Sequence, residues 1–214
     1  MTREEAKRRT RQRLLDAALE ILDEEGEAGL TTTNVTQRAG IGQSSFYVHF
    51  SDMEELLREL IDNLWKRRAF LQRAARRRSR AAPHDHDLVR HALRVPIADL
   101  LEHPEVFRLV LRSRLDRSTA LGEWTHSLLE TSRRNLIEDL AALGAPTATE
   151  QDRRRLEMLA DGFIGLTDVL TLGHLEGRYP DIEEIVDVLL LFSRGLLSLS
   201  AEGGQGSRRR TTST

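Results

Sequence analysis

Apolar side chains recur with the period of an α-helix along almost the whole of this 214-residue chain. In the segments 14–22, 56–65 and 182–199, apolar residues stand three or four positions apart, which places them on one face of a helix. No segment shows the strict alternation of apolar and polar residues that a half-buried strand requires. The sequence therefore predicts an all-α fold.

Capping residues and glycines divide this pattern into separate helices. Thr2-x-x-Glu5 and Ser51-x-x-Glu54 have the spacing of capping boxes, in which two side chains satisfy the free N–H groups that begin a helix. We expect three regions: a compact helix-turn-helix domain at residues 1–50, a larger helical domain at 51–200, and a low-complexity, disordered tail at 201–214.

Charge is unevenly distributed, although the net charge is only −2. The first 13 residues carry six basic and two acidic side chains, and residues 28–51 carry no acid. Residues 66–80 carry eight basic side chains and again no acid. Local basic surfaces on a mildly acidic chain are typical of a binding face for an anionic partner.

Several classes of protein are excluded or disfavoured. The chain has no cysteine, which excludes disulfides, thiolate catalysis and cysteine-bound zinc. Its N-terminus does not resemble a signal peptide, and its longest apolar run is too short to span a bilayer. We therefore expect a cytoplasmic protein without a membrane partner.

The stretch AGIGQSSFYVHF, residues 39–50, predicts the second half of a helix-turn-helix unit. Phe46 and Phe50 are four residues apart, so both can anchor one face of a short helix. The polar side chains between them are left facing outward, and they are of the kind that reads base edges in a major groove. Thr32 and Thr33, at the start of the preceding helix, suit contacts to phosphate.

Other interpretations of the same residues are possible. Gly40-x-Gly42 resembles part of a phosphate-binding loop, but it follows a helix and lacks the third glycine. Ser44 or Ser45 with His49 resembles a nucleophile and base, but no nearby acid orients the histidine. The alternative function left open is a helical enzyme or small-molecule carrier in which the N-terminal unit is structural.

Two further clusters have competing interpretations. The segment 84–91 contains potential metal ligands in a polar connector, where a solvated break and a helix start are favoured; these ligands are His84, Asp85, His86, Asp87 and His91. We expect neither a metal nor a cofactor. The arginine run 76–78 suits an anionic ligand group, an approach to DNA or a solvated helix end.

Residues 10–57, TRQRLLDAALEILDEEGEAGLTTTNVTQRAGIGQSSFYVHFSDMEELL, resemble the DNA-binding domain of TetR-family transcriptional regulators. The order of features, the turn glycine and the Phe-Tyr-x-His-Phe ending all agree. The resemblance implies a homodimeric repressor, not an enzyme, which binds a palindromic double-stranded DNA operator and is released by a small ligand. Val48 and Met53 depart from the family pattern, since many members have a polar or larger side chain and a lysine there.

The expected DNA contacts come from two sources. By position in the family motif, the resemblance implies contacts from Thr32, Thr33, Gln43, Ser44, Ser45, Tyr47 and His49. The basic start of the chain adds side chains that can lie over the DNA backbone or reach the minor groove, namely Lys7, Arg8, Arg9 and Arg11.

The last two helices are unusually apolar and contain glycines, which suggests close packing with the same helices of a second copy. An ordinary monomer core is the alternative. The residues concerned are Gly162, Phe163, Leu166, Val169, Leu170, Gly173, Ile185, Leu189, Phe192, Leu196 and Leu199.

A small apolar effector is expected among the middle helices. The candidate wall residues are Leu100, Val106, Phe107, Val110, Leu111, Trp124, Leu128 and Phe163. The stretch EHPEVFRLVLRSR, residues 102–114, is similar to TetR-type regulators that respond to acyl-CoA. An acyl-CoA effector and a lipophilic drug or metabolite are the two alternatives.

Overall fold

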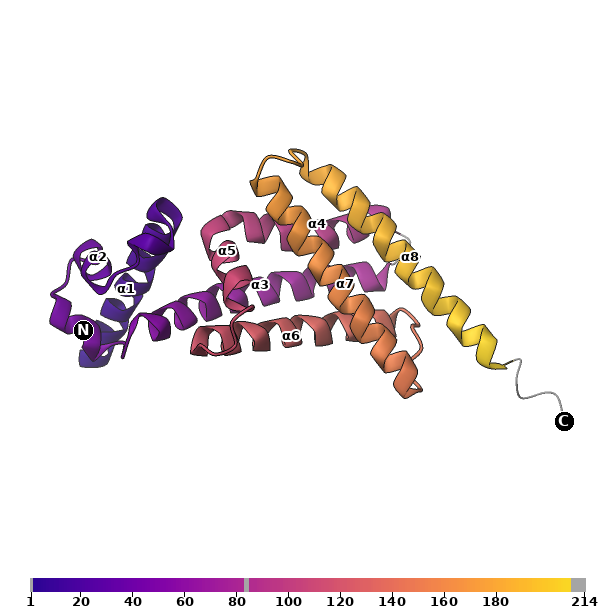
Figure 1. Cartoon of the computed structure of the whole chain (residues 1–214), viewed down its shortest axis with the longest axis horizontal. Helices are drawn as coiled ribbons and strands as arrows, with labels where there is room; N and C mark the ends of the chain where they lie inside the picture. The colour runs from indigo at the N-terminus through magenta and orange to yellow at the C-terminus, as the bar shows by residue number, and fades with distance from the viewer. Residues whose placement is uncertain (1, 83–84, 209–214) are drawn as a thin grey trace. The chain divides into compact units, whose positions relative to one another are not determined.

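The computed structural model describes residues 2–82 and 85–208, except for the side chains of residues 68 and 196–208. Every regular element among these residues is a helix, which confirms the predicted all-α fold (Figure 1). The elements are α1 (Arg3–Glu25), the 3₁₀ helix η1 (Glu27–Gly29), α2 (Thr32–Arg38), the 3₁₀ helix η2 (Gln43–Val48), α3 (Met53–Ala81), α4 (His86–Glu102), α5 (Pro104–Ser113), α6 (Ala120–Ala142), α7 (Glu150–Leu175) and α8 (Ile182–Arg208).

The start of α1 is the predicted capping box. The Glu5 N–H donates to Thr2 Oγ1 at 3.2 Å, and the Thr2 N–H donates to the Glu5 carboxylate at 2.7 Å. The helix ends at Gly26, whose φ of 70° lies in the left-handed region that favours glycine. Along the buried face, Leu14 and Leu22 are fully inaccessible to solvent.

The second predicted capping box is displaced by one residue. The Glu55 N–H donates to Asp52 Oδ1 at 2.7 Å, and the Ser51 N–H donates to Glu55 Oε2 at 2.7 Å. The cap of α3 is therefore Asp52, and the prediction of Ser51 with Glu54 was wrong. The physical reason is that Glu54 is engaged elsewhere, because its carboxylate accepts a hydrogen bond from the Leu121 N–H at the start of α6.

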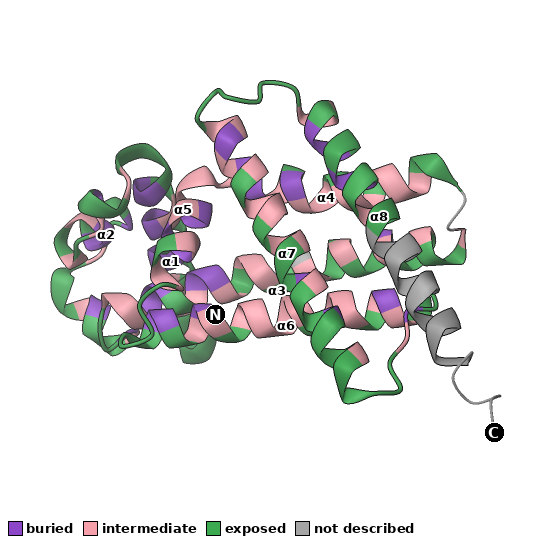
Figure 2. Ribbon diagram, turned by 45° about the vertical axis from the view of Figure 1, so that its right-hand side comes forward, coloured by how far each residue is buried: buried purple, intermediate pink, exposed green. Residues whose placement is uncertain are grey.

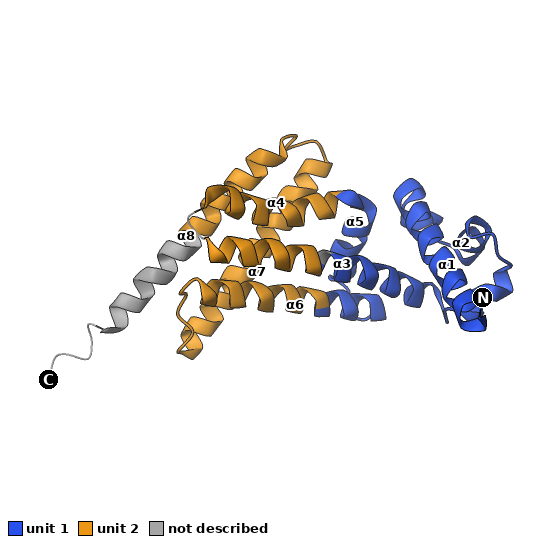
Figure 3. Ribbon diagram, turned by 180° about the vertical axis from the view of Figure 1, so that it is seen from behind, with its two compact units in different colours: residues 1–69, 102–127 blue, residues 70–101, 128–214 orange. Residues whose placement is uncertain are grey.

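Contacts between residues divide the chain into two units (Figure 3). Unit 1 comprises residues 1–69 and 102–127, and unit 2 comprises residues 70–101 and 128–214. In unit 1, α1 packs against both α2 and α5. In unit 2, α7 packs against α8, and both contribute to a core that also includes α4. By its contacts, helix α5 therefore belongs to unit 1, together with the N-terminal helices.

The core of unit 2 uses apolar residues that were expected at a dimer interface. Ile185 and Leu189 on α8 are buried against Ile97 of α4, and Phe163, Leu166 and Leu170 of α7 pack on the same cluster. Gly173 is also internal, because a Cβ there would lie 2.5 Å from the ring of Tyr179. These residues cannot serve as a free surface, since α7 and α8 use that face to cover α4.

A second, outer face of α7 and α8 remains open, as the green segments of Figure 2 show. Met158 and Val169 on α7 are 67% and 56% exposed, and Leu191 on α8 is 67% exposed. Gly162 and Gly165 lie between the two α7 residues, and a Cβ at either position would meet open space. Helical spacing places all four α7 residues on one stripe.

Helix α8 extends to Arg208, beyond the predicted end near Ser200. Gly203, Gly204 and Gly206 each disfavour a helix, so local propensity did not predict this extension. The side chains of Leu196 and Leu199 and the whole of residues 209–214 lie outside the described residues. Within the described part of the chain, no helix has the length and apolar character to cross a membrane.

Candidate nucleic-acid interface

Three apolar side chains hold the N-terminal helices together. Val35 on α2 and Phe46 on η2 are fully buried, and Phe50 is 1% exposed. The rings of Phe46 and Phe50 are 5.8 Å apart, tilted at 41°. The expectation that the two phenylalanines anchor the second short helix is confirmed, and that helix is a 3₁₀ turn.

The turn between α2 and η2 depends on Gly40. Its φ is 63°, and its N–H donates to the Gln37 carbonyl at 3.0 Å. The next N–H, of Ile41, donates to the Thr36 carbonyl at 3.0 Å. These bonds satisfy the last carbonyls of α2 and direct the chain sharply into η2.

The turn brings the polar starts of α2 and η2 together. Gln43 and Thr33 are exposed, and the Gln43 amide lies 3.4 Å from Thr33 Oγ1. Tyr47 is 61% exposed, with its ring edge-on to Phe46 at 5.4 Å. Ser44 is exposed, whereas Thr32 and Ser45 are partly buried at the rim. Val48 is 66% exposed on the same face. Residues 28–51 contain no aspartate or glutamate, so this face carries no acidic side chain from that segment.

His49 lies partly buried at the end of η2. Burial lowers the pKa of its imidazole below the ordinary value of 6.5, and the charges of Lys7 and Arg11 lower it further. Its Nδ1 is inaccessible and has no hydrogen-bond partner among the described residues. The lowered pKa favours the neutral form of this imidazole.

Arg11 occupies an internal network. Its Nε donates to the two oxygens of Glu59 at 2.9 and 3.0 Å, and its guanidinium carbon lies 4.0 Å from the centre of the Phe50 ring. Further bonds reach the Glu55 carboxylate, at 3.4 Å, and the His49 carbonyl. The Glu59 hydrogen bond is the main reason that the pKa of Arg11 is raised. Arg11 thus joins α1 to η2 and α3, although it was expected to face DNA.

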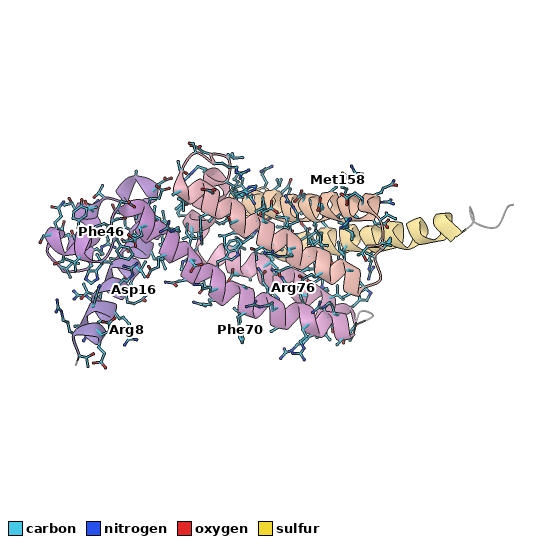
Figure 4. All side chains as sticks on the ribbon, turned by 90° about the horizontal axis from the view of Figure 1, so that it is seen from below. Arg8, Asp16, Phe46, Phe70, Arg76 and Met158 are labelled. Carbon is cyan, nitrogen blue, oxygen red and sulfur yellow. The ribbon has the colours of Figure 1, made fainter. Side chains whose placement is uncertain are left out.

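The other basic residues at the start of α1 are exposed. Lys7, Arg8 and Arg9 form no ion pair within the described part of the chain. Arg8 projects outward from α1 in Figure 4. The charge of Lys7 acts on His49, so this end of α1 lies near the end of η2.

Two arginines that position the unit were not found by sequence reasoning. Arg13 on α1 donates to the Ala39 carbonyl at the end of α2. Arg38 on α2 donates to Glu24 at 2.9 Å and to Glu25 at 3.2 Å, both near the end of α1. Their partners stand 13 to 26 positions away, so no local pattern marks them.

The eight candidate effector-pocket residues fall in two units. Val106, Phe107 and Val110 are buried on α5, the helix that packs against α1. Leu111 and Trp124 are partly buried in the same unit. In unit 2, Leu100 is buried and Leu128 is partly buried, while Phe163 packs in the core cluster of α4, α7 and α8.

The polar connector before α4 acts as a cap. Asp85 Oδ1 accepts hydrogen bonds from the N–H groups of Asp87, at 3.0 Å, and Leu88, at 3.1 Å. His86 lies against the guanidinium of Arg194. The described residues contain no group of three metal-binding side chains, and His84 lies outside them.

Comparison with known proteins identifies the class. Residues 14–60 match the family model for bacterial regulatory proteins of the tetR family. An uncharacterized HTH-type transcriptional regulator from Haemophilus influenzae is 35% identical over 115 residues, which are 53% of this chain and 55% of that relative. The chain thus spans about half the length of the curated relative it matches. Residues 14–60 therefore form a helix-turn-helix domain of the kind found in bacterial regulatory proteins of the tetR family, and over 115 residues the chain is similar to an HTH-type transcriptional regulator.

Solved structures agree in fold. A TetR-family transcriptional regulator from Streptomyces coelicolor gives a TM-score of 0.68 at 20% identity, covering 92% of this chain and 94% of that chain. A TetR-like transcriptional regulator from Rhodococcus sp. RHA1 gives a TM-score of 0.63 at 19% identity, covering 87% and 95%. At these identities the likeness establishes the fold alone.

Proposed function

We propose that this protein is a cytoplasmic homodimeric repressor that reads a palindromic double-stranded DNA operator through α2 and η2. The observation that carries the proposal is the exposed, acid-free face formed where the starts of α2 and η2 meet, which we call the reading face. The N-terminal unit that carries this face is called the reading head. Tyr47, Gln43 and Ser44 supply an aromatic edge, an amide and a hydroxyl suited to base edges or phosphates. We keep residues 1–50 as the DNA-binding domain and residues 51–200 as the domain for ligand and dimer.

Phosphate contacts come from the first turns of α1. Lys7, Arg8 and Arg9 are exposed and without ion-pair partners among the described residues, so their charge is available to the DNA backbone. Neutralised phosphates release counterions, and the affinity should therefore fall steeply with salt. Arg11 takes a positioning role in this proposal, because its guanidinium already holds Glu59.

The outer stripe of α7 and α8 supports the homodimer. Met158, Val169 and Leu191 expose apolar surface, and Gly162 and Gly165 leave room for a helix to approach closely. Met158 projects from α7 in Figure 4. Two reading heads must meet half-sites about 34–36 Å apart, which a monomer cannot do.

A small apolar effector acts, in this proposal, through α5. Val106, Phe107 and Val110 are buried on α5, and polar contacts tie this helix to α1 and η1: His103 Nδ1 lies 3.0 Å from Asp23 of α1, and Arg112 donates to Glu27 of η1 at 2.7 Å. A ligand that displaces α5 therefore strains α1 directly. Within the apolar class, we favour acyl-CoA because of the similarity of residues 102–114 to regulators that respond to it.

DNA binding is tested by gel shift with the DNA upstream of the gene. Tyr47→Ala should weaken specific binding by about 1–3 kcal/mol, because the variant loses a contact to a base edge or phosphate. Tyr47→Phe removes only the hydroxyl, and Tyr179→Phe removes that of the chain's other tyrosine as a matched control. Unchanged affinity for Tyr47→Ala, with an intact circular dichroism spectrum, would reject the assigned reading face.

The effector is tested by mass spectrometry of small molecules that copurify with the full chain. An acyl thioester that copurifies should release the protein from its operator when added to the complex. Since coupling is reciprocal, operator DNA should weaken binding of that compound by the same factor. A compound that binds equally well with and without DNA is not the effector.

A further inference from the structure

The outward face of the second half of α3 is hollowed. An open hollow of about 530 Å³ lies along this one helix face, lined by Phe70, Arg73, Ala74, Arg77, Arg78 and Ala81. These residues recur at helical spacing, so they form one stripe along the helix. In Figure 4, Phe70 projects from the free side of α3, whereas Arg76 lies toward the neighbouring helices. We name these six residues the Phe70 stripe.

The arginines of this segment divide into two groups. Arg76 and Arg80 form ion pairs with Asp139 of α6, at 2.8 and 3.0 Å. Burial lowers the pKa of Arg76 and raises that of Asp139, as expected for charges withdrawn from water. The three arginines of the Phe70 stripe have no such partner within the described part of the chain. Their charge is open to an anion from outside.

The apolar part of the stripe needs its own explanation. Basic residues at the end of a helix are favoured by the helix dipole, which accounts for arginines there without any ligand. It does not account for Phe70, which is 68% exposed beside them. Ala74 and Ala81 have short side chains, so between the longer arginine side chains they leave apolar surface accessible in the hollow.

We propose that the Phe70 stripe binds an amphiphile with an oxyanion head, either carboxylate or phosphate. Its apolar body lies on Phe70 and Ala74, and its head is held by Arg73 and Arg77. The arginine fork matches both oxyanions through paired hydrogen bonds. This site is separate from the residues proposed for the effector and does not depend on operator binding.

A tryptophan at position 70 gives a local reporter. Phe70→Trp is tolerated at an exposed position, and its fluorescence is compared with that of the unaltered chain, which contains two other tryptophans. Decyl phosphate and decanoate, each below the concentration at which micelles form, should shift the added emission to the blue and saturate. Saturation by one anion only would define which head the site takes.

Removing the arginines tests the head group. Arg73→Gln with Arg77→Gln in the Phe70→Trp chain should weaken binding about tenfold or more, since each charge-assisted bond is a large part of the affinity. Arg117→Gln, at an exposed position off the stripe, is the matched control and should bind normally. Decanol should bind at least about tenfold more weakly than decyl phosphate for the same reason.

Four results would overturn the proposal. They are no emission change with either anion, equal affinity after both arginines are replaced, an equal response to inorganic phosphate alone, and a response only to vesicles of anionic phospholipid. The last result would identify a membrane surface as the partner instead. Circular dichroism of each variant confirms that the helices remain, so that lost binding is not lost folding.

Discussion

At the scale of single residues, Arg11 shows that a basic side chain near the proposed DNA-binding face can be engaged within the protein itself. Its guanidinium holds Glu59 and stacks on Phe50, and it is bound between α1 and α3. Arg8, three positions earlier, is exposed and unpaired among the described residues. The two arginines therefore have separable effects.

Arg11→Gln should lower the free energy of unfolding by about 1–2 kcal/mol, because it leaves a partly buried Glu59 without its partner. Arg8→Gln, the matched control, should change stability by less than about 0.5 kcal/mol, as is usual for a surface position, while weakening operator binding. Urea unfolding and gel shift measure the two effects. If Arg11→Gln unfolds at the same urea concentration as the unaltered chain, the network is not stabilising.

The exposure of the reading-face residues could be predicted, because helical spacing determines which side chains stand opposite Phe46 and Phe50. The partners of Arg11, Arg13 and Arg38 could not, since each lies on another helix. A basic residue near the start of a DNA-binding domain looks the same in sequence whether it binds phosphate or a carboxylate. Only the packing of α1 distinguishes the two.

At the scale of elements, the cap of α3 connects the reading face to the long helix that follows. The Asp52 carboxylate accepts a hydrogen bond from the Glu55 N–H, and this bond is the main reason that the pKa of Asp52 lies below its ordinary value of 3.8. The hydrogen bond from the Ser51 hydroxyl is the second reason. A lowered carboxyl pKa means that the charged cap stabilises the fold above the unfolded pKa. That stabilisation is lost as the pH falls through the lowered value.

Asp52→Ala should destabilise the protein by about 0.5–2 kcal/mol, as expected for loss of a helix cap. Ser51→Ala is the matched control and should cost clearly less, because the Ser51 side chain only supports Asp52. Thermal unfolding at pH 7 compares the two variants. A larger loss of stability for Ser51→Ala than for Asp52→Ala would contradict this assignment and favour Ser51 as the capping residue.

Helices were predictable as elements because periodicity and caps are local signals. The one-residue shift of this cap was not, since both Ser51-x-x-Glu54 and Asp52-x-x-Glu55 satisfy the pattern. The choice depends on Glu54 binding the start of α6, a contact 67 positions away. The local capping pattern therefore locates the start of this helix to within one residue. Tertiary contacts then decide which of the two possible capping residues is used.

At the scale of the whole molecule, α7 and α8 serve two surfaces at once. Their inner residues close the core on α4, and their outer stripe remains apolar and exposed. From sequence the two faces could not be separated, because both are rich in leucine, valine and glycine. The distinction between the inner and outer faces determines which substitutions test the dimer and which ones disrupt the core.

Leu191→Glu should convert the proposed dimer into a monomer at micromolar concentration, because a buried carboxylate without a partner is strongly unfavourable at an interface. Leu191 is 67% exposed within one chain, so the monomer itself should remain folded. Leu115→Glu makes the same chemical change at a residue that is 88% exposed and outside α7 and α8. Analytical ultracentrifugation should find monomer for the first variant and dimer for the second. Operator affinity should fall with the dimer, since one reading head keeps only half of the contacts. A Leu191→Glu protein that sediments as a dimer would place the interface elsewhere, whereas monomeric behaviour of both variants would show that the exposed stripe has no special role.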